Sequence, residues 1–358
     1  MTSTAGSRVV GPRRMRPALF YTMLLPLLAA AVMGAVLVGS TSISPGTVLH
    51  VIASKALPAG WSAVTPATRA EEAIVWLIRV PRVLVAGIVG AGLATAGALM
   101  QGLFRNPLAE PSLVGVGPGA VLGAVTVFVM GWSSRSVVVL PLLAIATALL
   151  SLLVVYAIAT RGGVTPVTTL LLAGIAVGGL LTSLSSLLLS LNIVTWQVTQ
   201  DIVFWMMGGL DSRTWTHVWL SAPFVAVGVV GSLFQTRDLD LLLLGEESAA
   251  ALGVDVEAAK RLLVLTAALL TGASIAVAGM VGFVGLVVPH GVRLLLGPPH
   301  RTLLPASALL GATFLIACDL AARTVIAPVE IRLGIVTSLC GTPFFLLLLV
   351  RRLREAQG

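Results

Sequence analysis

Residues 83–103 read VLVAGIVGAGLATAGALMQGL and contain no charged side chain. The hydrocarbon core of a bilayer is about 30 Å thick, and a helix needs about 20 apolar residues to cross it. Because lipid offers no water to backbone N–H and C=O groups, a crossing segment must pair them within a helix. This stretch therefore predicts a membrane-spanning α-helix.

Apolar runs of the same kind occur on both sides of this stretch. They cover residues 18–40, 113–131, 137–160, 167–191, 217–235, 261–281, 283–296, 303–322 and 333–350. The first run exceeds the ~7–15-residue apolar region of a signal peptide, so it is interpreted as a retained helix. The sequence predicts an all-α integral membrane protein with about ten transmembrane helices.

The composition favours a single polytopic domain over residues 1–358. Only 10% of the residues are charged, whereas soluble domains carry about 25%. The net charge of +8 comes from cations scattered between apolar runs, which indicates helix topology rather than a nucleic-acid partner. The positive-inside rule places both termini in the cytoplasm, with residues 1–17 as a cytoplasmic tail.

An internal repeat accompanies the apolar runs. Residues 90–97 read GAGLATAG and residues 272–279 read GASIAVAG, and the same offset superposes Pro107 on Pro289. Five predicted crossings between the copies would make this an inverted-topology repeat, an arrangement common among transporters. The small residues would also allow close helix packing whether or not the repeat is ancestral.

Sequence signals for an enzyme or a metal site are absent. The histidines lie in four separate segments, at His50, His217, His290 and His300. No Gly-rich phosphate-binding turn precedes Lys55 or Lys260, so the chain is not expected to hydrolyse ATP or to be an enzyme. We expect no resident cofactor and no metal site.

Charges in the middle of the predicted helices are also scarce. Asp319 and Arg323 lie near a helix end, and no mid-helix Asp, Glu or Lys offers a proton or ion relay. An ion-coupled secondary transporter therefore remains only as the alternative from another class. An intramembrane enzyme would need a catalytic pair at matched depth, which the sequence does not offer. The pattern favours a helical bundle that takes its energy from another molecule.

The longest predicted cytoplasmic segment covers residues 236–260. It holds six of the fourteen acidic residues: Asp238, Asp240, Glu246, Glu247, Asp255 and Glu257. Helical spacing places Glu247, Ala251 and Val254 on one face, with Leu252 beside them. A short amphipathic helix here could dock a partner or merely cap the bundle, and the spacing leaves both interpretations open.

Several strings carry a family resemblance. They are IRVPRVLVAGIVGAGLATAGALMQGLFRNPLAEPSLVGV at 78–116, LLLAG at 170–174, FWMMGGL at 204–210, LGEESAAALGV at 244–254 and GFVGLVVPHGVRLLLGPPHRTLLPASALLGA at 282–312. Over nearly its whole length the chain resembles the permease family of ATP-binding-cassette importers for iron siderophores, heme and cobalamin. The resemblance implies a bacterial inner-membrane protein that pairs with a second copy, a cytoplasmic ATPase dimer and a periplasmic binding protein.

The resemblance also implies roles for individual residues. Arg79, Arg82 and Arg323 match outward arginines that pair with glutamates of the binding protein. The cytoplasmic gate corresponds to Asn106, Pro107, Leu108, Val167 and Thr168, although Val167 departs from the small hydroxyl residue that is usual there. The helix that couples to the ATPase corresponds to Gly245, Glu246, Glu247, Ala250, Leu252 and Gly253. ATP would be used by the partner ATPase and not by this chain.

The cargo follows less directly from the sequence. No Cys, His or Met cluster is present that could strip and hold a bare metal ion, so an intact bulky chelate is expected to cross. The strings WMMGGL and GPPHR resemble those of heme and cobalamin permeases. Heme is therefore placed first, with ferric siderophores and cobalamin as alternatives.

Overall fold

The computed structural model describes residues 15–39, 41–56, 67–191 and 195–357. The first half contains α1 Pro17–Leu37, α2 Pro45–Ala56, α3 Arg69–Ala73, the π-helical turn η1 Ile74–Arg79, α4 Val80–Leu103, the 3₁₀ turn η2 Pro111–Val114, α5 Val116–Val129, the 3₁₀ turn η3 Trp132–Ser134 and α6 Val139–Ala159. The second half contains α7 Val167–Leu191, α8 Trp196–Met206, α9 Trp215–Phe234, α10 Thr236–Leu242, α11 Glu246–Ala251, α12 Val256–Ala278, α13 Val284–Leu296, α14 His300–Thr324 and α15 Leu333–Gln357.

The helices reproduce the ten predicted crossings. Seven helical stretches of the described chain are long and apolar enough to cross a membrane: α1, the continuous rod Arg69–Leu103, α6, α7, α9, α12 and α14. Three shorter apolar helices, α5, α13 and the segment Leu333–Leu347 of α15, match the remaining runs. The predicted all-α membrane fold is confirmed. The structure adds α2, α3 and α8, which are too short or too polar to give a membrane-spanning signal.

One boundary differs from its prediction. The run that was expected to start at residue 83 belongs to a rod that begins at Arg69. Pro81, in the first turn of α4, lacks the N–H that an α-helix would use, and the preceding turn η1 is π-helical, with the Val80 N–H bonded to the Val75 carbonyl. Because the π turn changes the register before the proline, the helix continues through it. Arg79 and Arg82 therefore lie within a helix.

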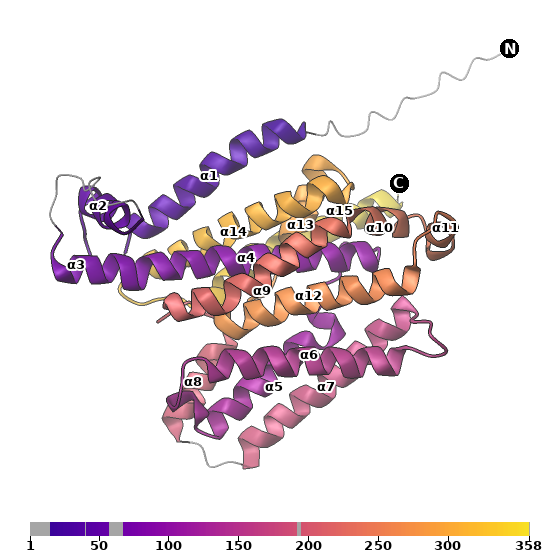
Figure 1. Ribbon diagram of the computed structural model, residues 1–358, viewed down its shortest axis with the longest axis horizontal. Helices are drawn as coiled ribbons and strands as arrows, with labels where there is room; N and C mark the ends of the chain where they lie inside the picture. Colours follow the sequence, from indigo (N-terminus) through magenta and orange to yellow (C-terminus); the bar gives the residue numbers. More distant parts are fainter. Residues whose placement is uncertain (1–14, 40, 57–66, 192–194, 358) are drawn as a thin grey trace.

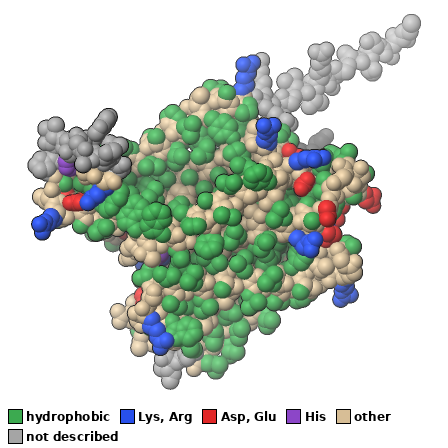
Figure 2. Space-filling model, viewed as in Figure 1, with side chains coloured by type: hydrophobic (Ala, Val, Ile, Leu, Met, Phe, Trp, Pro, Cys, Tyr) green, Lys and Arg blue, Asp and Glu red, His purple; other side chains and the backbone are tan. Residues whose placement is uncertain are grey.

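The bundle has α4, α12 and α14 at its centre, with α1 along one side and α5, α6 and α7 along the other (Figure 1). The segments α10 and α11 lie at the same end as the C-terminus, whereas α2, α3 and α8 lie at the opposite end. Hydrophobic side chains cover the face between the ends, and charged side chains gather at the ends (Figure 2). This distribution matches a bilayer around the middle of the bundle. We call the end with α10 and α11 the inner end and the opposite one the outer end.

Glycines allow the central helices to touch. A Cβ at Gly90 would lie 2.2 Å from the Gly311 carbonyl oxygen of α14, and one at Gly97 would lie 1.8 Å from the Gly285 carbonyl oxygen of α13. Gly92 of α4 faces Ser274 of α12 in the same way, so the two copies of the sequence repeat pack against each other. The close packing is a property of the structure, whereas a common ancestry of the copies stays a prediction.

Replacement of Gly97 by alanine should destabilise the bundle, because the new methyl group would overlap the backbone of α13. Overpacking of this kind costs about 1–3 kcal/mol, so the thermal unfolding midpoint of the detergent-purified protein should fall. Gly231→Ala in α9 is the matched control, because a Cβ there meets nothing within 4 Å. An equal midpoint for the two variants would contradict the packing account.

Candidate functional sites at the two ends of the bundle

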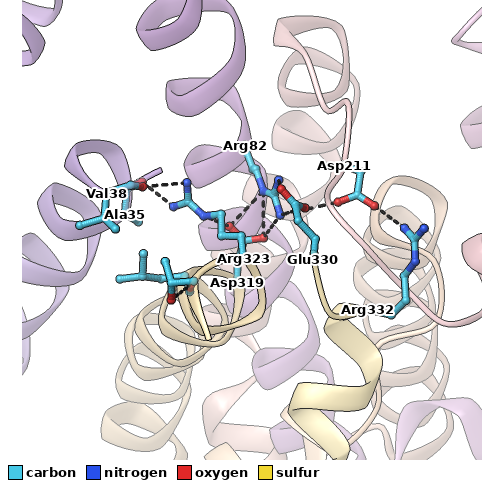
Figure 3. Close-up of polar contacts among 10 residues, drawn as sticks. Ala35, Val38, Arg82, Asp211, Asp319, Arg323, Glu330 and Arg332 are labelled. Atoms are coloured by element: carbon cyan, nitrogen blue, oxygen red, sulfur yellow. Dashed lines mark hydrogen bonds and ion pairs between the residues drawn. The ribbon is translucent and has the colours of Figure 1, made fainter. Parts of the chain in front are cut away.

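Arg82 is the centre of a charged cluster at the outer end (Figure 3). Its Nε donates to Asp319 at 3.0 Å, and its two terminal nitrogens reach Glu330 at 3.1 and 2.9 Å in a bidentate pair. Arg82 is 9% exposed and Asp319 only 1%. Two buried charges are tolerated here because each has a partner with good geometry.

Arg79 and Arg323 bind the C-terminal end of α1. Arg79 donates to the carbonyl oxygens of Val36 at 3.0 Å, Leu37 at 2.9 Å and Thr41, while Arg323 donates to those of Val38 at 3.1 Å and Ala35. The last carbonyls of a helix have no partner within the helix and carry partial negative charge. Both arginines are buried, so they complete the end of α1 in a place that water reaches poorly.

The sequence predicted that these three arginines face outward and pair with glutamates of the binding protein. The structure places all three at the end of the bundle that we call the outer end and pairs each with groups of its own chain. The side chains of Glu330 and Asp211 around Arg82 are 39% and 40% exposed. The docking role itself stays a prediction.

Asp211 extends the charged cluster toward α15. It pairs with Arg332 and lies 3.7 Å from Arg82. Partial burial and the neighbouring Glu330 raise the pKa of Asp211 above its ordinary value. At the outer end, the carboxylates of Asp211 and Glu330 therefore both pair with Arg82.

A polar pocket of about 280 Å³ opens beside Asp211, between the α5–α6 connection, α8 and the start of α9. Its charged or titratable lining residues are Asp201, Asp211, Arg213, His217 and Arg332. Burial lowers the pKa of Arg213 to about 10, and Arg332 lies 4.0 Å from the centre of the Phe204 ring. No sequence pattern indicated this pocket, because its residues come from distant segments with no shared motif.

The predicted coupling segment forms two short helices, α10 and α11, at the inner end. Gly245 and Gly253, with φ of 117° and 86°, flank α11, and such backbone favours glycine. Glu247, Ala250 and Leu252 are exposed there. The predicted face is wrong in one respect: α11 ends at Ala251 and Val254 is buried, because the chain turns at Gly253.

Asp240 ties α10 to the bundle. Its Oδ1 lies 2.6 Å from the Nδ1 of His300 and accepts the backbone N–H of His300 at 3.0 Å. Partial burial opposes ionisation, but these hydrogen bonds hold the pKa of Asp240 below its ordinary value. A carboxylate at the N-terminus of α14 also suits the helix dipole.

The predicted gate residues lie in the irregular segment after α4 and in the first turn of α7, at the inner end of the bundle. After α4, Arg105 has a φ of 47°, and the Asn106 side chain accepts the Leu108 N–H at 3.0 Å, which closes a local turn around Pro107. Val167 begins α7 and Thr168 follows it, exposed. Among the described residues, no hydrogen bond or ion pair joins the two segments, so any closure between them would involve another chain or another state.

An apolar bundle of membrane-spanning helices with charged ends is the architecture of a multi-pass membrane protein. A model of the FecCD transport family matches residues 27–351. The chain belongs to this family, and it is a permease of the ATP-binding-cassette importer class.

Individual relatives agree with this assignment. The cobalamin import system permease protein of Halobacterium salinarum is 46% identical over 280 residues, which are 78% of this chain and 73% of that protein. The hemin transport system permease protein of Yersinia pestis is 38% identical over 352 residues, 96% of this chain and 99% of that protein. A solved structure described as a metal-chelate type ABC transporter in an inward-facing conformation superposes with a TM-score of 0.81 at 29% identity, covering 94% of this chain and 100% of that one.

The buried arginines can be tested for their internal role. Replacement of Arg82 by alanine should leave the Asp319 carboxylate short of a partner in a buried place, which costs about 3–5 kcal/mol and lowers the unfolding midpoint. Arg69→Ala is the control, because Arg69 is exposed on the same helical rod. If Arg82 served only an outside partner, both variants would unfold at the wild-type temperature.

Proposed function

We propose that this chain is the transmembrane subunit of an importer that passes an intact iron chelate or tetrapyrrole, with heme first, into the cytoplasm. The observation that carries the proposal is the match to the Y. pestis hemin permease, which extends over 99% of that protein. The cobalamin relative is more similar per residue but over a smaller share of its length. Cobalamin and ferric siderophores therefore stay as the alternatives.

The described residues support a chelate rather than a bare ion. They contain no group of three or more His, Cys, Asp and Glu side chains that could hold a metal ion. A bare transition-metal ion crossing the membrane would need such ligands to replace its water shell. A chelate brings its own ligands and asks only for a path of weak contacts.

The energy source in this proposal is a separate ATPase chain that binds α11. Exposed Leu252, 53% accessible, and exposed Glu247 are available to a partner. The ion-coupled alternative is disfavoured, because the buried Asp319 already forms ion pairs with Arg82 and Arg323.

The assembly that we propose has two copies of this chain in a bacterial inner membrane, two ATPase subunits at the inner end and a periplasmic binding protein at the outer end. Both termini would be cytoplasmic; most of the predicted tail 1–17 lies outside the described residues. At the outer end, Arg82 is the docking candidate with partly exposed partners, whereas Arg79 and Arg323 would act by holding α1.

Transport can be measured in vesicles that contain the chain with the ATPase and binding protein of its host. We expect ATP-dependent uptake of heme that exceeds uptake of cobalamin and of a ferric siderophore. Uptake of cobalamin alone would correct the cargo and keep the importer. Accumulation driven by an ion gradient, with no ATPase present, would contradict the proposal.

A changed charge on α11 or at its C-cap, Leu252, should uncouple this transport. Glu247→Lys and Leu252→Arg change exposed side chains, so the protein should fold normally while its affinity for the ATPase and its ATP-dependent uptake fall by about tenfold or more. Arg135→Glu, exposed at the outer end, is the control. Copurification of the ATPase and uptake are the measurements, and wild-type values for both α11 variants would refute this docking surface.

A further inference from the structure

Lys260 is a buried lysine that has no assigned role in docking, gating or ATPase coupling. It lies in α12 and is 2% exposed. Its Nζ donates to the Thr165 carbonyl oxygen at 2.7 Å and pairs with Glu246 at 3.0 Å and Glu257 at 2.5 Å. An ammonium has three N–H donors, and three acceptors from three segments of the chain occupy them.

Glu257 closes the same cluster from the other side. Its Oε2 accepts the Thr165 backbone N–H at 3.1 Å. Both backbone groups of Thr165 are therefore held by α12, the carbonyl by Lys260 and the N–H by Glu257. Thr165 is itself 1% exposed. A position fixed in this way cannot move relative to α12 without exposing or unpairing a charge.

The turn that precedes Thr165 is closed by backbone hydrogen bonds. Arg161 and Val164 exchange backbone hydrogen bonds of 3.0 and 3.1 Å, and Gly162 and Gly163 between them have φ of 60° and 81°. Positive φ at both central residues is the geometry of a tight hairpin turn. The hydroxyl groups of Thr160 and Thr165 lie 2.8 Å apart across its base. A displacement of Thr165 would therefore carry the whole turn between α6 and α7.

Glu246 joins the buried Lys260 to the protein surface. It is the first residue of α11, and its side chain is 37% exposed. Among the described residues, its bond with Lys260 is the ion pair that joins α11 to the bundle. Thr165, on the far side of Lys260, stands two positions before Val167, where α7 begins.

We infer that Lys260 is a positioning residue that transmits movement of α11 to the start of α7. The inference rests on the proposed function, since it takes α11 as the ATPase contact and Val167 and Thr168 as gate residues. A docked ATPase that shifts α11 would move Glu246, and the buried ammonium would pass that displacement to Thr165 and the turn before it. Apolar packing at this point would slide more easily, because it lacks direction.

The first test compares Lys260→Gln with Arg261→Gln in ATPase-containing vesicles, with heme, cobalamin and ferric citrate as probes. The control removes the same charge from the next residue of the helix, which is exposed. We expect Lys260→Gln to lower cargo imported per ATP hydrolysed by at least about fivefold, the lower range of coupling between sites, with ATP hydrolysis retained. Arg261→Gln should keep the wild-type ratio. A wild-type ratio for folded Lys260→Gln would overturn the inference.

A second variant covers the case in which Lys260→Gln does not fold. Glu246→Gln changes a partly exposed side chain and leaves the bonds of Thr165 in place. Hydrogen exchange of the Thr165 amide should slow when the ATPase binds the wild-type chain, and this response should disappear in Glu246→Gln. If Lys260 only stabilised the fold and transmitted no movement, ATPase binding would slow exchange at Thr165 equally in the wild type and in Glu246→Gln. If the wild-type chain imports none of the probes but ATPase binding still slows exchange at Thr165, the cargo proposal fails and the role of Lys260 stands. If ATPase binding does not change exchange at Thr165 in the wild-type chain, the role of Lys260 is refuted.

Discussion

The structure depends on one constraint: the interior of a bilayer offers no water to an unpaired backbone group or charge. The constraint accounts for the uncharged centre of the long helices and for the glycines that let α4 touch α13 and α14. It also accounts for the arginines of the outer end. A helix such as α1 ends with carbonyl groups that need donors, and Arg79 and Arg323 supply them from η1 and α14. These arginines therefore stabilise the fold, whether or not they also contact a partner.

Arg82 shows how far a motif can be interpreted from sequence. The string R-V-P-R singled out Arg79 and Arg82 through a family pattern, and the docking role that the pattern implied stays a prediction. It could not indicate that Arg82 would pair with Asp319 and Glu330, which are 237 and 248 positions away. Pairing over that distance depends on how α4 packs against α14, and that packing depends on glycine contacts that no local pattern specifies.

The same limit applies at the inner end. The sequence predicted the ten apolar runs, since length and hydropathy are local signals. Residues 236–260 contain α10 and α11, and their coupling role stays a prediction. Lys260 entered the sequence analysis only as a lysine without a phosphate-binding turn. Its burial follows from three acceptors that the fold brings together, and a lone lysine at the edge of an apolar run carries no sign of them.

The predicted coupling segment makes two polar contacts with the bundle, and each leads to a different part of the predicted gate. Through Glu246 and Lys260, α11 is connected to the turn before α7. Through Asp240, α10 is connected to His300 at the start of α14, and His300 packs so closely on the end of α4 that a Cβ at Gly102 would lie 2.9 Å from its Nε2. The segment that contains Asn106 begins just after that point. A displacement of the predicted coupling segment would therefore reach both predicted gate segments through these buried polar contacts.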